Sequence, residues 1–322
     1  MTDAKAGLLT LLAAVGIGFV VQWFAIERKS PMRNPTTARR TWPIHIGVGV
    51  ITDFLDTLGV GSFANTSSLF RLGKMVSDEN IPGTMNAGHT LPTLAQAFIY
   101  VAIIKVDMTT LATMIAASVA GAFVGAGIVA GWSRRRIQGG MGALLIVAAF
   151  IIVLRQLQLI PGGGMAQGLT GLPLALGIAG NFVLGTLMTL GIGLYAPCMI
   201  LVSLLSMNPR VAFPIMMGSC AFLMPVASIR FIKKQRYDLR ATLGLTLGGV
   251  PAVLVAAYVV RSLPLAVIQW LVVAIVLYTA VGLLRSAIAT CGHRRRHGNR
   301  YHGQSSTCSG PQLTTRPRSN AK

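Results

Sequence analysis

The 322-residue chain contains little charge and very little acid. Only 11% of its residues are charged, whereas soluble domains carry about 25%. Eight residues are Asp or Glu and 28 are Lys or Arg, so the net charge is +20. Hydrophobic residues make up 53% of the chain, in apolar runs that recur from residue 8 to residue 284. This composition excludes an ordinary soluble domain and predicts an all-α polytopic membrane protein.

Other absences exclude further classes of function. The chain has no GxSxG, P-loop or HExxH motif, so an enzyme and an ATP-driven pump are both disfavoured. Four cysteines, Cys198, Cys220, Cys291 and Cys308, are too scattered for a disulfide framework and form no CxxC pair. We therefore expect no cofactor and no metal site.

The positive charge lies in short clusters between the apolar runs. A basic surface that binds nucleic acid would concentrate this charge on one folded domain, and aromatic residues do not interleave with it here. Clusters of Lys and Arg between apolar runs are instead typical of cytoplasmic loops. They occupy residues 27–43, 71–79, 134–136, 230–240 and 286–322. The expected partners are a lipid bilayer and a small substrate, with no nucleic acid, and a homo-oligomer is left open.

Two Gly-containing octets divide the chain into similar halves. The first, TLGVGSFA, covers residues 57–64, and the second, TLGIGLYA, covers residues 189–196. The offset of 132 residues between Thr57 and Thr189 also aligns Pro82 with Pro214. Ordered matches at one fixed offset indicate an internal duplication, which determines the architecture.

Each octet interrupts a long apolar run, at residues 44–72 and 174–205. Gly59 and Gly61 divide the first run into pieces that are too short to cross a hydrocarbon core of about 30 Å at about 1.5 Å per residue. We predict two half-helices that enter and leave the membrane on the same side. Such a break is tolerated where it lines a cavity or is buried in protein.

The remaining apolar runs predict seven transmembrane helices, which together with the two re-entrant broken helices form two inverted repeats. They lie at residues 8–26, 84–104, 108–131, 140–159, 211–229, 241–260 and 265–284. This arrangement places all the basic clusters on one side, as the positive-inside rule requires. It puts the N-terminus outside the cell inner membrane and the C-terminus in the cytoplasm.

The same arrangement defines five parts of the chain. An N-terminal helix with its basic loop is followed by the first repeat, an uncharged Gly-rich linker, the second repeat and a basic tail for which we expect no fold. These parts cover residues 1–43, 44–160, 161–173, 174–285 and 286–322.

The second octet and the residues after it carry a resemblance to a known family. The stretch GIGLYAPCMIL at residues 191–201 and the stretch PRVAFP at residues 209–214 resemble the sulfite exporter family TauE/SafE. The resemblance covers residues 44–285 and implies transport of small anions, including sulfite and sulfonated organic acids. The first copy departs from the pattern because it has Asn65 where the second has Pro197.

Inverted repeats with discontinuous helices place a binding site where the half-helix ends meet. A helix N-terminus offers free N–H groups and partial positive charge, which suit an anion. We therefore predict that residues 62–66 and 194–198 face one another, with hydroxyls of Ser67 and Ser68 as further donors. The alternative is that the glycines only permit close helix packing. The predicted substrate-binding residues are Gly59, Gly61, Ser62, Asn65, Thr66, Gly191, Gly193, Pro197 and Cys198.

Asp53, Asp56 and His89 are anomalous because they lie in apolar segments and have no counterparts in the second half. Intramembrane acids are costly and mark function by default, and histidine exchanges protons near neutral pH. We predict that these three residues couple transport to protons. The acids could instead bind a cation, pair with Arg71, or touch cytoplasmic water from a shallow half-helix, and His89 could be a packing residue.

Together these patterns predict a secondary transporter that moves a small anion, such as sulfite or an organosulfonate, by alternating access with proton coupling. Two alternatives stay open. The first is a cation or metal carrier that uses the two acids and His89. The second is a non-transporting membrane anchor or assembly protein whose basic tail docks a partner.

Overall fold

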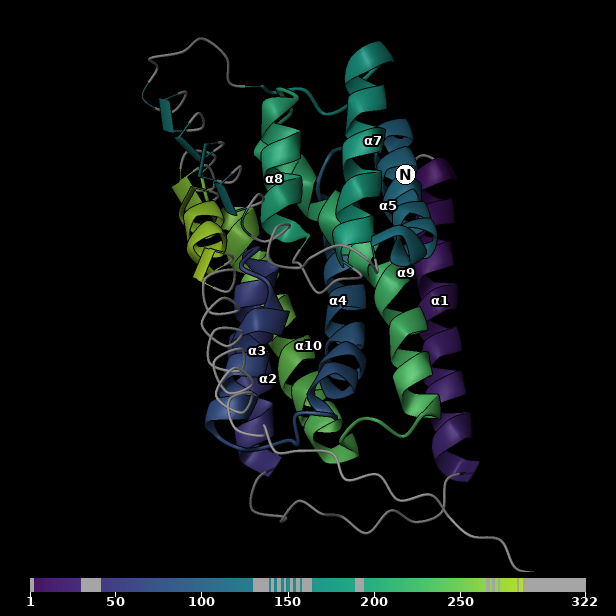
Figure 1. Cartoon of the computed structure of the whole chain (residues 1–322). Helices are drawn as coiled ribbons and strands as arrows, with labels where there is room; N and C mark the ends of the chain where they lie inside the picture. Colours follow the sequence, from purple (N-terminus) through teal and green to yellow (C-terminus); the bar gives the residue numbers. More distant parts are fainter. Residues whose placement is uncertain are drawn as a thin grey trace, which may run out of the picture.

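The computed structural model is a bundle of long helices that lie roughly side by side (Figure 1). It describes residues 3–29, 42–129, 164–188 and 194–264, together with some residues between 139 and 157 and between 267 and 285. Over these residues the regular structure is helical, apart from one isolated β-bridge between Ala166 and Met207. The predicted all-α class is therefore confirmed.

The helices follow the chain in two similar sets. The first half contains α1 (Asp3–Lys29), α2 (Trp42–Thr57), α3 (Ser62–Leu72), α4 (Ile81–Ile103) and α5 (Met108–Val129). The second half contains α7 (Gly171–Met188), α8 (Tyr195–Leu204), the 3-10 helix η2 (Pro209–Val211), α9 (Ala212–Lys233) and α10 (Leu239–Ser262). Helix α7 thus begins at Gly171, inside the predicted linker.

The offset of 132 residues relates the helices as well as the sequence. Added to the start of α3, α4 and α5, it gives the start of α8, α9 and α10 to within one residue. It also relates two uncommon backbone conformations, because Lys74 and Ser206 both have positive φ, 48° and 59°. The two halves therefore have the same local structure, as a duplicated unit should.

The halves pack reciprocally through small residues. Helix α2 of the first half lies against α10 of the second, while its counterpart α7 lies against α5, the counterpart of α10. A Cβ added at Gly49 would lie 2.5 Å from the carbonyl oxygen of Leu245, and one at Gly185 would lie 2.0 Å from that of Ser118. Glycine therefore permits backbone contact at both interfaces, as is common between membrane helices.

Equivalent helices α4 and α9 run in opposite directions. The first turn of α4 contacts the loop after α9, where Thr84 Oγ1 accepts a hydrogen bond from the N–H of Asp238 at 2.8 Å. At the other end of α4, the ring of Tyr100 lies 5.1 Å from that of Phe213 in the first turn of α9. This antiparallel pairing is the relation that inverted repeats require.

The end of α1, the start of α2, the loop between α3 and α4 and the loop between α9 and α10 lie at one end of the bundle (Figure 1). The end of α1 approaches the loop after α9 there, because the hydroxyl of Tyr237 bonds to the carboxylate of Glu27 and accepts from the indole N–H of Trp23 at 3.1 Å. The start of α1 lies at the opposite end, where Lys5 Nζ donates to the carbonyl of Ala102 at 2.7 Å.

Four helices of the described segments are long and apolar enough to cross a membrane. They span Asp3–Lys29, Gly171–Met188, Pro209–Lys233 and Leu239–Val259. Helix α4 has 23 residues, about 35 Å at about 1.5 Å per residue, but it is less apolar because it carries buried polar side chains such as Thr84, His89 and Gln96. The count of seven crossings stays a prediction, and residues 131–138 with the basic triplet lie outside the described residues.

The contact between α2 and α10 gives a first testable prediction. Gly49→Ala places a methyl group against the backbone of Leu245, whereas none of the described residues lies within 4 Å of a Cβ at Gly47. We expect Gly49→Ala to lower the stability of the detergent-solubilised protein by about 1–3 kcal/mol. Gly47→Ala, the matched control on the same helix, should leave the thermal midpoint unchanged or raise it. Equal midpoints for the two variants would contradict this packing.

Candidate functional site

The first break is a tight turn that requires glycine. Gly59 and Gly61 have φ values of 98° and 88°, in a region that other residues rarely adopt. The turn is closed by hydrogen bonds from Gly59 N to Asp56 O, 2.8 Å, and from Val60 N to Leu55 O, 3.1 Å. A Cβ at Gly59 would lie 2.1 Å from Cε of Met199 on α8. The predicted break in residues 44–72 is thus confirmed, and the turn contacts α8 of the second half.

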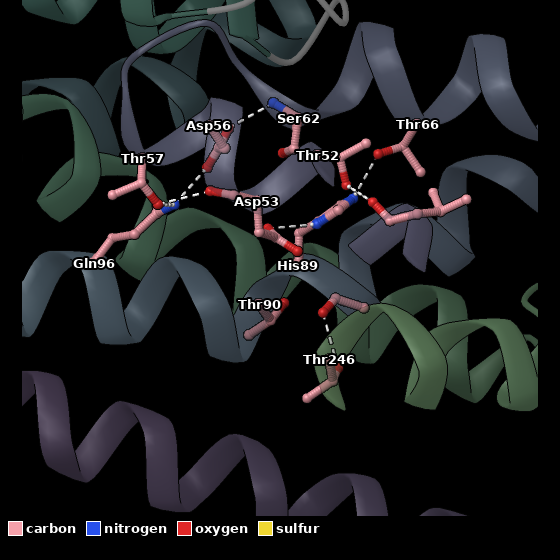
Figure 2. Close-up of polar contacts among 12 residues, drawn as sticks. Thr52, Asp53, Asp56, Thr57, Ser62, Thr66, His89, Thr90, Gln96 and Thr246 are labelled. Atoms are coloured by element: carbon pink, nitrogen blue, oxygen red, sulfur yellow. Dashed lines mark hydrogen bonds and ion pairs between the residues drawn. The ribbon is translucent and has the colours of Figure 1, made fainter. Parts of the chain in front are cut away.

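The carboxylate of Asp56 joins the two half-helix tips. Its Oδ1 accepts a hydrogen bond from the N–H of Ser62, the first residue of α3, at 2.5 Å (Figure 2). Its Oδ2 accepts from the hydroxyl of Tyr195, the first residue of α8, at 3.2 Å. Asp56 therefore supplies the negative charge that a helix N-terminus favours, and it links helices that are 139 residues apart in sequence.

Asp53, His89 and Thr66 form a second buried chain of contacts. Oδ1 of Asp53 lies 2.8 Å from Nδ1 of His89, and Nε2 of His89 lies 2.9 Å from the hydroxyl of Thr66 (Figure 2). Because a hydroxyl both donates and accepts, this chain is compatible with a neutral and with a protonated imidazole. The arrangement is therefore suited to gaining and losing a proton.

Both acids are enclosed by protein. The side chains of Asp53 and Asp56 are 0% and 1% exposed, and a Cβ at Gly249 of α10 would lie 2.1 Å from Oδ2 of Asp53. The alternative of a shallow half-helix in contact with cytoplasmic water is wrong for this state. The suggested pair with Arg71 is also wrong, because Arg71 lies 3.5 Å from the exposed Asp78.

Two residues that no sequence pattern had indicated, Gln96 and Tyr100, complete the site. Gln96 of α4 donates from Nε2 to Oδ2 of Asp56 and to Oγ1 of Thr57, each at 2.9 Å. Tyr100, one turn further along α4, donates from its hydroxyl to the carbonyl of Thr57 at 2.8 Å. Their spacing in the sequence could have indicated them, because His89, Gln96 and Tyr100 share one face of α4 at intervals of seven and four residues.

Several predicted site residues lie elsewhere. Asn65 donates from Nδ2 to the carbonyl of Gly61 at 2.9 Å and accepts from the hydroxyl of Tyr278 at 2.8 Å, so its side chain turns back over the break. Ser67 and Ser68 both donate to the carbonyl of Ala64 in their own helix. The prediction that these two hydroxyls would face a ligand is therefore not supported, because each bonds within α3.

The second tip is only partly described. Pro197 and Cys198 are buried in the first turn of α8, where proline is tolerated because its missing N–H has no partner within the helix. Gly191 and Gly193 lie outside the described residues. The N-cap residues Gly61 of α3 and Leu194 of α8 both lack a side-chain cap hydrogen bond. Among the described contacts, α3 differs because its first N–H, that of Ser62, binds the carboxylate of Asp56. The two tips therefore differ in their electrostatic environment.

Within the described part of the chain, no group of three or more His, Cys, Asp or Glu side chains is placed to hold a metal ion. The polar cluster instead consists of two acids, one histidine and neutral hydrogen-bonding groups (Figure 2).

The fold and the cluster define a multi-pass membrane protein of two repeats, with an ionisable cluster where broken helices meet. Residues 172–313 match the sequence model of a family described as Sulfite exporter TauE/SafE. This match begins in the first turn of α7 and confirms the resemblance for the second repeat. The family is one of membrane transporters of sulfur anions, not of enzymes. Neither the curated proteins nor the solved structures gave a match to the chain.

The link made by Asp56 gives a second prediction. Asp56→Ala removes the acceptor for three buried donors, from Ser62, Gln96 and Tyr195. Each unsatisfied donor costs about 1–3 kcal/mol, so we expect a large drop in the thermal midpoint of the purified protein. Asp56→Asn retains one acceptor oxygen and should lose much less stability. A midpoint for Asp56→Ala equal to that of the wild type would contradict the link.

Proposed function

We propose that this protein is a secondary transporter of a small sulfur oxyanion, sulfite or an organosulfonate, that works by alternating access in the cell inner membrane. The family match supports the class and the anion. The observation that carries the proposal is the junction at Asp56, where both half-helix tips meet a single buried negative charge. Helix N-terminal ends that bind a carboxylate can also bind a small oxyanion.

The substrate would bind between the tips, in competition with the carboxylate of Asp56. Two negative charges at one enclosed position repel one another, so arrival of the anion requires Asp56 to accept a proton or to move away. The uncapped N-terminus of α8 and the hydroxyl of Tyr195 would donate to the anion. Gly61 leaves room for it, because no described residue lies within 4 Å of a Cβ at that position.

Proton transfer would proceed through Asp53, His89 and Thr66. Asp53 lies one helical turn before Asp56, and His89 is within hydrogen-bond distance of both Asp53 and Thr66. A proton taken up by this chain changes the charge next to the substrate position without requiring another ion. This proximity supports the proposed coupling of anion movement to protons.

The two hairpins α2–α3 and α7–α8 would be re-entrant in this transporter, within seven transmembrane helices. The end of the bundle that gathers the basic loops would face the cytoplasm, with the N-terminus outside. A cation carrier is the weaker candidate. It is favoured only by Oδ2 of Asp53, which has no hydrogen-bond partner among the described residues.

The proposal predicts sulfite movement that responds to a pH gradient. In proteoliposomes, an imposed gradient of two pH units should concentrate labelled sulfite by up to about a hundredfold if one proton accompanies each anion. Asp53→Asn should abolish this response, because the amide cannot exchange the proton. Asp78→Asn is the matched control, since it removes one exposed acid outside the cluster.

Two results would count against the proposal. Absence of sulfite and sulfonate movement by folded wild-type protein would contradict the transport function. A pH response retained by Asp53→Asn, at the size seen for Asp78→Asn, would contradict the role of the Asp53 chain while leaving transport intact.

A further inference from the structure

A cavity of about 290 Å³ lies between the end of α4 and the start of α9. Its walls include Tyr100, Lys105, Gln167, Asn208, Arg210 and Val211. It is at the end of the bundle opposite the basic loops, since α4 begins beside those loops and ends here. A water molecule takes up about 30 Å³ in the liquid, so the cavity has room for an ion of four heavy atoms with part of its hydration shell.

Among the described residues that line the cavity, the charged ones are Lys105 and Arg210, and both are cations. Arg210 donates from Nη2 to the carbonyl of Leu263 at 2.7 Å, while its buried Nε has no hydrogen-bond partner among the described residues. The nearby acid Asp107 is already bonded, because its Oδ2 accepts from the N–H and the hydroxyl of Thr110 at 2.8 and 2.9 Å. The cavity therefore offers positive charge and N–H donors, which recognise oxyanions.

The position of these cations is also unusual. Lysine and arginine are scarce on the non-cytoplasmic side of a membrane protein, yet two of them meet in this one cavity. Tyr100 belongs both to the cavity wall and to the buried cluster, because its hydroxyl donates to the carbonyl of Thr57, the residue after Asp56. The ring of Tyr100, packed on Phe213, thus stands between the cavity and the half-helix tips.

We propose that this cavity is a second binding site for a small oxyanion, on the non-cytoplasmic side of the protein. Lys105 and Arg210 hold the anion there, before or after it passes Tyr100 and Phe213 on its path to the tips. The choice of sulfite as ligand rests on the function proposed above. The case for the cavity as a binding site rests on the two cations, Lys105 and Arg210, that line one partly open space.

The test is equilibrium binding of sulfite to the full-length protein in lipid nanodiscs, measured by calorimetry. Lys105→Gln and Arg210→Gln should each weaken binding by about tenfold, as expected for loss of a charge-assisted hydrogen bond. Arg210→Lys keeps the charge and should bind more tightly than Arg210→Gln. The matched control is Lys5→Gln, which removes a cation at the same end but outside the cavity wall.

Arg210→Gln also removes the hydrogen bond to the carbonyl of Leu263, so the thermal midpoint is measured for every variant. Lys105→Gln tests the same site at an exposed position, where a loss of stability is not expected. Wild-type affinity in the double variant Lys105→Gln/Arg210→Gln would overturn the proposal, as would an equal loss in Lys5→Gln. Binding that depends on these charges without flux in proteoliposomes would support the cavity and contradict the transport function. Flux in proteoliposomes, together with sulfite binding that does not depend on these two charges, would support the transport function and contradict the cavity site.

Discussion

The structure depends on one buried carboxylate. Asp56 binds the first N–H of α3 and the first side chain of α8, and so it holds together two half-helices from different repeats. A buried charge is stable only when it is paired or fully hydrogen-bonded. Here Asp56 accepts from three described donors: the Ser62 N–H at the positive end of α3, Gln96 and Tyr195. The same contacts hold the N-terminal ends of α3 and α8 close together.

The fold is symmetric but the chemistry is not. Equivalent helices pack reciprocally, α2 on α10 and α7 on α5, and glycine contacts support both interfaces. The ionisable groups Asp53, Asp56 and His89 all come from the first repeat, however, while the second provides Tyr195 and an uncapped helix end. Duplication thus gives two similar half-helix ends, and the two acids and the histidine lie beside both of them but come from the first repeat alone.

Local patterns in the sequence predicted the breaks, the duplication and the unusual acids, because glycine spacing and intramembrane charge are visible without tertiary structure. The pairing of Asp53 with His89 was not predictable, since it depends on how α4 packs against α2, across 36 residues of chain. The contacts of Gln96 and Tyr195 with Asp56 were not predictable for the same reason. The expectation for Ser67 and Ser68 failed because short hydroxyls in a helix bond their own carbonyls.

The measurement that tests the account most directly is the flux of labelled sulfite through Asp56→Asn protein, compared with the wild type in matched proteoliposomes. Asparagine keeps the shape of the side chain and an acceptor for Ser62, but it carries no charge and exchanges no proton. The account predicts a folded protein whose flux falls at least about a hundredfold, the usual scale for loss of an essential proton-transfer group. Wild-type flux in this variant would show that Asp56 only joins the helices and that the substrate path lies elsewhere.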